Sequence, residues 1–301
     1  MLSPRRIFAP PSLPGLSIVA TLLIVCTHIF GSPAQAAQPA PWQMGMQDPA
    51  SPVAEQIMWL HNWVLAMITV ITLFVAGLLL YVVWRFDAQR NTTPGRLSHH
   101  TGLEIAWTVI PVLILVIMAI PSFRLVYYED RTHAPDLTIK VTGHQWYWEY
   151  SYPTNGGVNF QSRMIATEDL KAGQLRLLDV DNQLVVPVGK NVQILTTSAD
   201  VIHSFFIPAL GVQRYAIPGR TIETWVRVDS PGVYYGECNQ VCGNNHSFMP
   251  IAIHGVPAAE FEAWLTAAKT KFAGDEAKPT PATLDPGSAD AARLAMIQVQ
   301  H

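Results

Sequence analysis

The stretch YYGECNQVCGNNHSFMP (residues 234–250) gathers metal-binding side chains in a chain that has only 3 cysteines. Cys238, Cys242, His246 and Met249 fall within twelve residues. Outside the cytoplasm, a disulfide loop is one reading of the two cysteines, and a zinc site is a second. A thioether is a poor zinc ligand, whereas thiolate, imidazole and thioether together suit copper. The residue types therefore favour copper over zinc and leave the disulfide open.

A copper site of this kind needs a further histidine from another part of the chain. The segment VIHSFFIP supplies His203, which we expect at a strand end shortly before Pro208. A lone histidine is usually a polar core or surface residue. Paired with the downstream cluster of residues 238–249, His203 becomes a candidate ligand.

Composition and hydropathy indicate membrane segments beside a globular part. Half of the 301 residues are hydrophobic and only 14% are charged. The formal net charge of -3 argues against a nucleic-acid-binding protein. Two apolar runs predict membrane-spanning helices over about residues 56–84 and 105–127. The loop between them carries Arg85, Arg90 and Arg96 against one Asp87, so the positive-inside rule places it in the cytoplasm. Both ends of the mature chain then face outward.

Residues 1–36 have the pattern of a signal peptide. Arg5 and Arg6 precede the apolar run SIVATLLIVCTHIF, and Ala34-Gln35-Ala36 fits the small-x-small cleavage rule. The alternative is an uncleaved membrane anchor. With cleavage, the mature chain keeps two cysteines, both in the stretch at 234–250.

Residues 131–272 are expected to form one all-β domain outside the membrane. Alternating β-branched and aromatic segments with Pro, Gly and Asn turns predict a sandwich or barrel. These segments read LTIKVTGHQWYWEYSY, LRLLDVDNQLVVPVG, VQILTTSADVIHSFFIPALG, TIETWVRVDSPGVYYGEC and MPIAIHGV. Residues 260–272 predict a terminal helix with Phe261, Trp264 and Leu265 on one side. The hairpin then occupies residues 37–130, and the Ala/Pro/Asp-rich residues 273–301 form a flexible tail.

The pattern C-x-x-x-C-G-x-x-H-x-x-M, preceded by D-V-I-H-S-F, resembles the copper A motif of subunit II of cytochrome c oxidase. SPVAEQI, GHQWYWEY, LLDVDNQLVVP and IPGR stand in the family's order, so the resemblance covers roughly residues 40–270. It implies a two-helix transmembrane hairpin plus an all-β cupredoxin-like barrel or sandwich domain. It also implies a subunit of the bacterial inner membrane with its copper domain on the periplasmic side.

The same resemblance implies a function and partners. Such a subunit accepts electrons from cytochrome c at a dinuclear copper A centre and passes them to haem in subunit I. Reduction of O2 to water, coupled to proton translocation, takes place there, and subunit III is a further partner. Haem is implied only on the partner subunit.

By this resemblance, six residues hold the copper: His203, Cys238, Gln240 (through its backbone carbonyl), Cys242, His246 and Met249. The two cysteines bridge both ions, His203 and Met249 complete one ion, and His246 with the Gln240 carbonyl completes the other. The family usually has Gln at position 237 and Glu at position 240, and here Glu237 and Gln240 are interchanged. The copper contact at position 240 is made by the backbone carbonyl, so the exchange of side chains should not remove it. The side chain of Gln240 lacks the charge that helps to hold a magnesium ion against subunit I, which argues against magnesium here.

Further roles follow from the resemblance. Trp146 corresponds to the residue through which electrons arrive from cytochrome c. The alternative is that Trp146 is only part of a packed aromatic cluster. Glu104 matches the glutamate at the mouth of a proton pathway into subunit I. The alternative is an ordinary acid at a helix N-terminus, stabilised by the helix dipole. Three acids, Glu149, Asp181 and Asp200, match an acidic face on which the basic cytochrome c would dock. The alternative is that they are solvated surface charges. The segment SYPTNGGVNF lacks carboxylates that many relatives place there, so we expect docking to depend less on salt than usual.

Two other functions compete with this interpretation. A quinol oxidase subunit shares the architecture but lacks the copper ligands that are present here. A membrane-anchored copper chaperone of the thioredoxin-like type has C-x-x-x-C and a distant histidine, but it should show βαβ patterns and one membrane helix. The hairpin and the predominance of strands favour the oxidase subunit.

Overall fold

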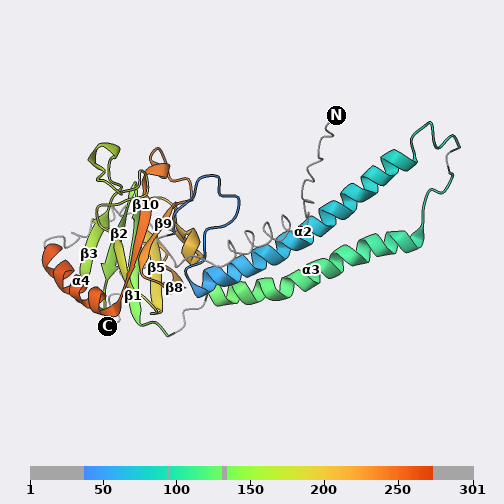
Figure 1. Cartoon of the computed structure of the whole chain (residues 1–301). Helices are drawn as coiled ribbons and strands as arrows, with labels where there is room; N and C mark the ends of the chain where they lie inside the picture. Colours follow the sequence, from blue (N-terminus) through green and yellow to red (C-terminus); the bar gives the residue numbers. More distant parts are fainter. Residues whose placement is uncertain (1–36, 94, 131–133, 274–301) are drawn as a thin grey trace, which may run out of the picture. The chain divides into compact units, whose positions relative to one another are not determined.

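The computed structural model describes residues 37–93, 95–130 and 134–273. Two long helices precede ten strands and a last helix in these residues (Figure 1). The expected signal peptide at 1–36 and the expected tail, apart from its first residue, lie outside the described residues.

Helix α2 (Pro52–Arg85) and helix α3 (Thr101–Asp130) are the two apolar helices. Both are long and apolar enough to cross a membrane, with mean hydropathies of 2.6 and 2.5. Helix α2 begins earlier than the hydrophobic run because Ser51 caps it: the Ser51 Oγ accepts a hydrogen bond of 3.0 Å from the backbone N–H of Ala54, and Pro52 occupies the first turn. With 34 residues, α2 is about 51 Å long, well beyond the roughly 30 Å hydrocarbon core.

Helix α3 also begins before its apolar run. The ring Nδ1 of His100 accepts from the backbone N–H of Leu103, and the Glu104 carboxylate accepts from the N–H of His100. These contacts satisfy backbone donors that a helix start leaves without partners. Pro111 and Pro121 lie inside α3, which membrane helices tolerate.

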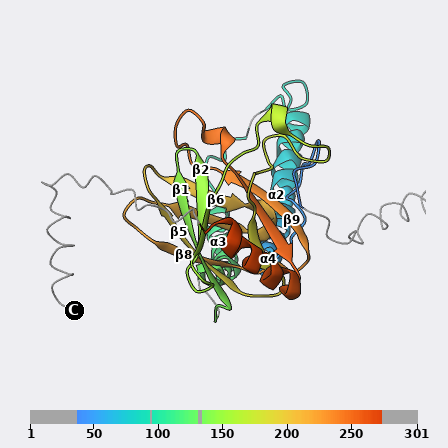
Figure 2. The same cartoon turned by 90° about the vertical axis from the view of Figure 1, so that its left-hand side faces the viewer.

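The strands of the described residues form two five-stranded sheets (Figure 2). The first sheet, in the order β3-β2-β1-β5-β8, contains β1 (Leu137–His144), β2 (Tyr147–Tyr152), β3 (Val158–Ser162), β5 (Val192–Ser198) and β8 (Ile222–Val226). The second, in the order β4-β10-β9-β6-β7, contains β4 (Leu184–Pro187), β6 (His203–Ile207), β7 (Val212–Ala216), β9 (Gly232–Cys238) and β10 (Pro250–Val256). The pairs β1–β5 and β4–β10 are parallel and the other pairs are antiparallel.

Alternating side chains from the two sheets meet in an aromatic core. On β2, Trp148, Tyr150 and Tyr152 are fully buried while their neighbours are half-buried. This period of two is the one that a half-buried strand requires. Helix α4 (Ala258–Lys271) contacts β3 and β4, and buries Phe261 and Leu265. The predicted fold, a helical hairpin followed by an all-β cupredoxin-like domain, is confirmed.

Direct contacts join the helix ends to the β-domain. The Ser51 hydroxyl donates to the backbone carbonyl of Leu210 at 2.7 Å. The indole N–H of Trp225 on β8 donates to the carbonyl of Tyr128 on α3 at 3.0 Å. Arg214 on β7 forms an ion pair with Asp130. These contacts attach the domain to the N-terminal end of α2 and the C-terminal end of α3.

Candidate metal centre

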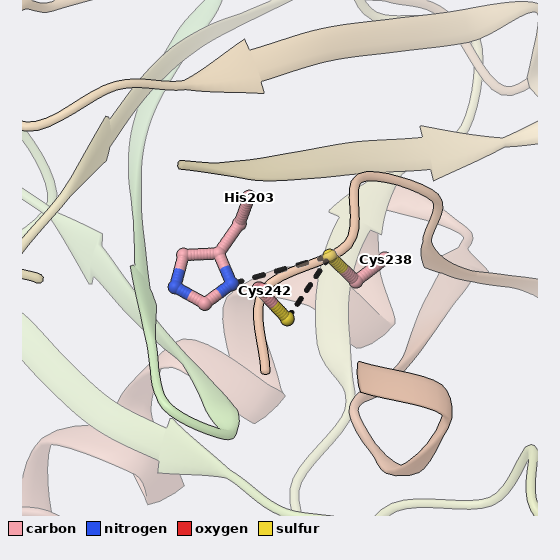
Figure 3. Close-up of side chains that lie close together, drawn as sticks. All are labelled: His203, Cys238 and Cys242. Atoms are coloured by element: carbon pink, nitrogen blue, oxygen red, sulfur yellow. Dashed lines mark hydrogen bonds between the residues drawn. The ribbon is translucent and has the colours of Figure 1, made fainter. Parts of the chain in front are cut away.

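The candidate ligands come from two neighbouring strands and the loop that follows one of them. His203 begins β6, and Cys238 ends β9. These strands are antiparallel neighbours with Phe205 opposite Cys238 in register. Sheet pairing therefore brings His203 to the cysteine loop from a distant part of the sequence (Figure 3).

The cluster has short distances between its donor atoms. The Sγ atoms of Cys238 and Cys242 are 3.9 Å apart, and the Cys238 Sγ is 4.0 Å from the Nδ1 of His203. The Cys242 Sγ is 3.5 Å from the Nδ1 of His246 and 3.6 Å from the Sδ of Met249. The ligand atoms of His203, Cys238 and Cys242 all lie within 4.8 Å of one another.

The carbonyl oxygen of Gln240 also faces this cluster. The Cys238 thiol donates to it at 3.3 Å. Three side chains and one carbonyl from the predicted ligand set thus lie around the two cysteine sulfur atoms. His203, Cys238, Cys242 and Met249 are buried, whereas His246 is half-buried.

The two cysteines are free thiols rather than a disulfide. Their sulfur separation of 3.9 Å is about twice the ~2.04 Å of an S–S bond. An ion about 2.3 Å from each thiolate allows a sulfur separation of up to about 4.6 Å. Both sulfurs can therefore bind the same ion, and imidazole and thioether donors lie beside them. This soft donor set fits copper.

The pKa values of the two thiols shift in opposite directions, and the Cys238 thiol ionises more readily than the Cys242 thiol. Burial opposes ionisation of Cys238, but hydrogen bonds with His203 and with backbone groups outweigh it and lower the pKa of this thiol. Burial and the charge of Cys238 raise the pKa of the Cys242 thiol. Contacts with Cys238 and Asp200 outweigh the effect of burial and raise the pKa of His203. Thiolate and neutral imidazole are the forms that bind a metal ion, so metal binding at this cluster would release protons.

A set of contacts fixes the ring of His203. Its Nε2 lies 2.8 Å from the Oδ1 of Asp200, which leaves Nδ1 to face Cys238. A Cβ at Gly143 would lie 2.8 Å from the His203 Cδ2, so only glycine leaves room for the ring. The indole of Trp148 lies 6.0 Å from the His203 ring, and its N–H donates to the carbonyl of Met249 at 3.2 Å.

These supporting residues were not predicted from the sequence in these roles. Asp200 was predicted as a docking acid, and the structure shows its carboxylate hydrogen-bonded to His203. Gly143 and Trp148 lie in the quoted segment LTIKVTGHQWYWEYSY. The period-two burial of β2 could have marked Trp148 as inward-facing.

Trp146 lies against the loop that carries Cys242. Its indole N–H donates to the carbonyl of Cys242 at 3.2 Å, and the side-chain amide of Gln145 donates to the same oxygen at 2.8 Å. A Cβ at Gly243 would come within 3.0 Å of both side chains. Half-buried Trp146 therefore connects the outer surface directly to a cysteine of the cluster.

The other predicted residues lie outside the cluster. The Glu149 carboxylate lies 3.4 Å from the Nε2 of His144, and this contact holds the pKa of Glu149 below its usual value. Asp181 is exposed and accepts a hydrogen bond from the backbone N–H of Arg163. Glu104 lies in the first turn of α3, about 39 Å along the helix from Asp130 at its other end.

Comparisons with known proteins agree with this architecture. Residues 137–256 match the family Cytochrome C oxidase subunit II, periplasmic domain, and residues 39–125 match Cytochrome C oxidase subunit II, transmembrane domain. A probable cytochrome c oxidase subunit 2 of Rickettsia bellii is 50% identical over 247 residues, which is 82% of this chain and 91% of that protein. Its counterpart in Rickettsia felis is 49% identical over 259 residues, 86% of this chain and 82% of that protein.

Among solved structures, the periplasmic domain of subunit II of cytochrome oxidase from Bradyrhizobium japonicum is 51% identical, with a TM-score of 0.44. The match covers 47% of this chain and 99% of that one. The two family matches and the relatives at about half identity establish that this chain belongs to the cytochrome c oxidase subunit II family.

Proposed function

We propose that the chain accepts electrons from cytochrome c at a pair of copper ions and delivers them to haem in subunit I of a proton-translocating oxidase. The observation that carries this proposal is the buried cluster of His203, Cys238 and Cys242, whose ligand atoms lie within 4.8 Å of one another. The family is that of a subunit of an oxidoreductase complex, and copper binding agrees with it.

In this proposal the six predicted ligands hold the metal in the roles given above. Copper supplies a centre that gains and loses one electron at a time. Cys238 and Cys242 contribute the two thiolates, and Asp200 keeps the ring of His203 turned toward them. Burial of both cysteines excludes water from the sulfur atoms.

Electrons would arrive through Trp146. Its hydrogen bond to the Cys242 carbonyl supports this route, because it joins a partly exposed aromatic ring to the cluster without an intervening residue. The donor would dock beside Trp146, near Glu149, Asp181 and Asp200.

Two contacts support the expectation of weak salt dependence. Glu149 lies beside His144, and Asp200 is hydrogen-bonded to His203. The carboxylates of Glu149 and Asp200 therefore already interact with histidines of the same domain and are less available to a docking partner. Asp181 is exposed, and its carboxylate accepts a hydrogen bond from the backbone N–H of Arg163. Screening by salt weakens interactions of such exposed charges most.

The remaining assignments follow the same proposal. Residues 1–36 direct export, residues 37–130 form the hairpin in the bacterial cell membrane, and residues 131–272 form the copper domain on the periplasmic side, with subunits I and III as neighbours. Glu104 lies at the cytoplasmic end of α3, where a proton pathway could begin. Gln240 contributes its carbonyl, and its neutral side chain argues against a magnesium ion.

Stopped-flow reduction of the assembled oxidase by reduced cytochrome c tests the function. Cys242→Ser should leave haem in place but abolish its rapid reduction by cytochrome c, while a small-molecule donor that reduces haem directly still works. Ser247→Ala changes an exposed residue of the same loop and serves as the matched control. Rapid haem reduction in the Cys242→Ser variant would refute the proposed route.

A further inference from the structure

The membrane hairpin contains a groove that the copper chemistry does not use. It lies between α2 and α3, which run side by side (Figure 1), and has a volume of about 270 Å³. Glu55, Trp59 and Leu60 line it from α2, and Pro121, Arg124 and Leu125 line it from α3. Both helix segments belong to the ends that carry the periplasmic domain.

The depth of the groove follows from the position of Arg124. The charge-free run at residues 105–123 precedes it directly, and these 19 residues extend about 28 Å along a helix axis. This length is close to the hydrocarbon thickness, so Arg124 reaches the outer boundary of the membrane core. Trp59, on the facing helix, is 60% exposed. Tryptophans are enriched at the membrane–water interface, which is the depth inferred for Arg124.

The groove is polar on its outer side and apolar on its inner side. Helix α2 enters the membrane with increasing residue number, so Leu60 lies deeper than Glu55. Helix α3 leaves it, so Pro121 lies deeper than Arg124. A molecule that fits this gradient has a charged head toward the periplasm and a hydrocarbon part toward the membrane centre.

The groove contains two charged residues, Glu55 and Arg124. Neither Glu55 nor Arg124 takes part in an ion pair among the described residues. By contrast, Asp130, further along α3, pairs with Arg214. Charges at the edge of a low-dielectric membrane are costly unless they are paired or hydrated. One groove with both an unpaired cation and an unpaired anion suits a ligand that carries both charges.

We propose that this groove binds a phospholipid with a zwitterionic amine headgroup, of the phosphatidylethanolamine class. Arg124 receives the phosphate, for which its guanidinium offers paired donors. Glu55 receives the ammonium group, and the face of Trp59 offers a cation–π contact. Leu60 and Pro121 contact the upper part of an acyl chain. The lipid would join the outer ends of the two helices where the β-domain is attached.

Native mass spectrometry of the full chain and of the assembled oxidase tests this site, and the measurement does not require copper. Both samples are extracted from nanodiscs that contain phosphatidylethanolamine and phosphatidylglycerol in equal amounts. The wild type should retain one phosphatidylethanolamine in each sample. Arg124→Gln should lower the retained fraction about tenfold or more, and Arg124→Lys should lower it less, because lysine keeps the charge but not the paired donors.

Glu55→Gln separates headgroup selectivity from general lipid adhesion. This variant should still retain lipid but lose the preference for phosphatidylethanolamine over phosphatidylglycerol. Arg85→Gln, at the cytoplasmic end of α2, is the matched control and should behave as the wild type. Equal retention of the two lipids by the wild type, or unchanged retention in Arg124→Gln, would overturn the proposal. Retention by the isolated chain but not by the assembled oxidase would also overturn it, because a neighbouring subunit would then fill the groove.

Discussion

Replacing Gly143 with alanine should disturb the metal centre through the ring of His203. The added Cβ would lie 2.8 Å from the Cδ2 and 3.0 Å from the Cγ of that ring. Ordinary contact begins at 3.4 Å, so the ring must move by about 0.6 Å, the difference between 3.4 and 2.8 Å. Metal-ligand distances tolerate only about 0.2 Å. A shift three times as large would take Nδ1 out of ligand range.

The surroundings leave the ring little freedom to move. His203 is fully buried, and its Nε2 is held 2.8 Å from Asp200. Overpacking of this kind costs about 1–3 kcal/mol. Displacement of a ligand held by such contacts typically lowers metal affinity by about 10–100-fold.

Two measurements on Gly143→Ala check these magnitudes. Thermal unfolding of the apoprotein reports the packing cost, and copper competition with a chelator reports affinity. Gly77→Ala is the control, because a Cβ there meets no atom within 4 Å. Copper affinity and apoprotein stability both equal to the wild type would refute the packing argument.

Three further predictions concern single side chains. Asp200→Asn should weaken copper retention about tenfold or more, because His203 loses its charged hydrogen-bond partner, while Asp181→Asn should not, as chelator competition can show. Trp146→Phe should slow reduction by cytochrome c in stopped flow without changing copper content, and a parallel loss of copper would contradict its assigned role. Burial lowers the pKa of His254, so protonation favours the unfolded chain and stability falls as pH drops through about 6.5 toward the lower folded-state pKa. His254→Gln should therefore lose less stability than the wild type between about pH 7 and pH 5, measured by thermal unfolding, and equal losses would contradict this.

The candidate metal cluster was largely predictable because most of its members are close in sequence. Cys238, Cys242, His246 and Met249 occupy one short loop, so their spacing already limits how far apart they can lie. His203 required knowledge of the motif, since only the pairing of β6 with β9 brings it near Cys238.

The contacts that support the cluster were not predictable in the same way. The sequence shows that Asp200 is acidic, but its hydrogen bond to His203 depends on how the loop before β6 folds. Gly143 is needed because of a side chain 60 positions later, and no local pattern reveals such a contact. These supporting contacts are tertiary, whereas hydrophobic periodicity reports local structure.

The boundaries of the helices and strands were likewise predicted only in part from the sequence. The apolar runs located both helices, but the caps at Ser51 and His100 extend them by several residues. The segment LRLLDVDNQLVVPVG suggested a long extended stretch, yet β4 covers only Leu184–Pro187. Asp179 accepts from the backbone N–H of Leu175 and from the hydroxyl of Tyr235, which stabilises turns before that strand.

Electron paramagnetic resonance of the full chain, purified in detergent and loaded with copper, tests the central claim most directly. The account predicts two copper ions per chain and hyperfine structure from one unpaired electron shared between two copper nuclei. Cys238 and Cys242 should both be required for this spectrum. A four-line signal from a single copper ion, or a silent protein with Cys238 and Cys242 joined in a disulfide, would contradict the account.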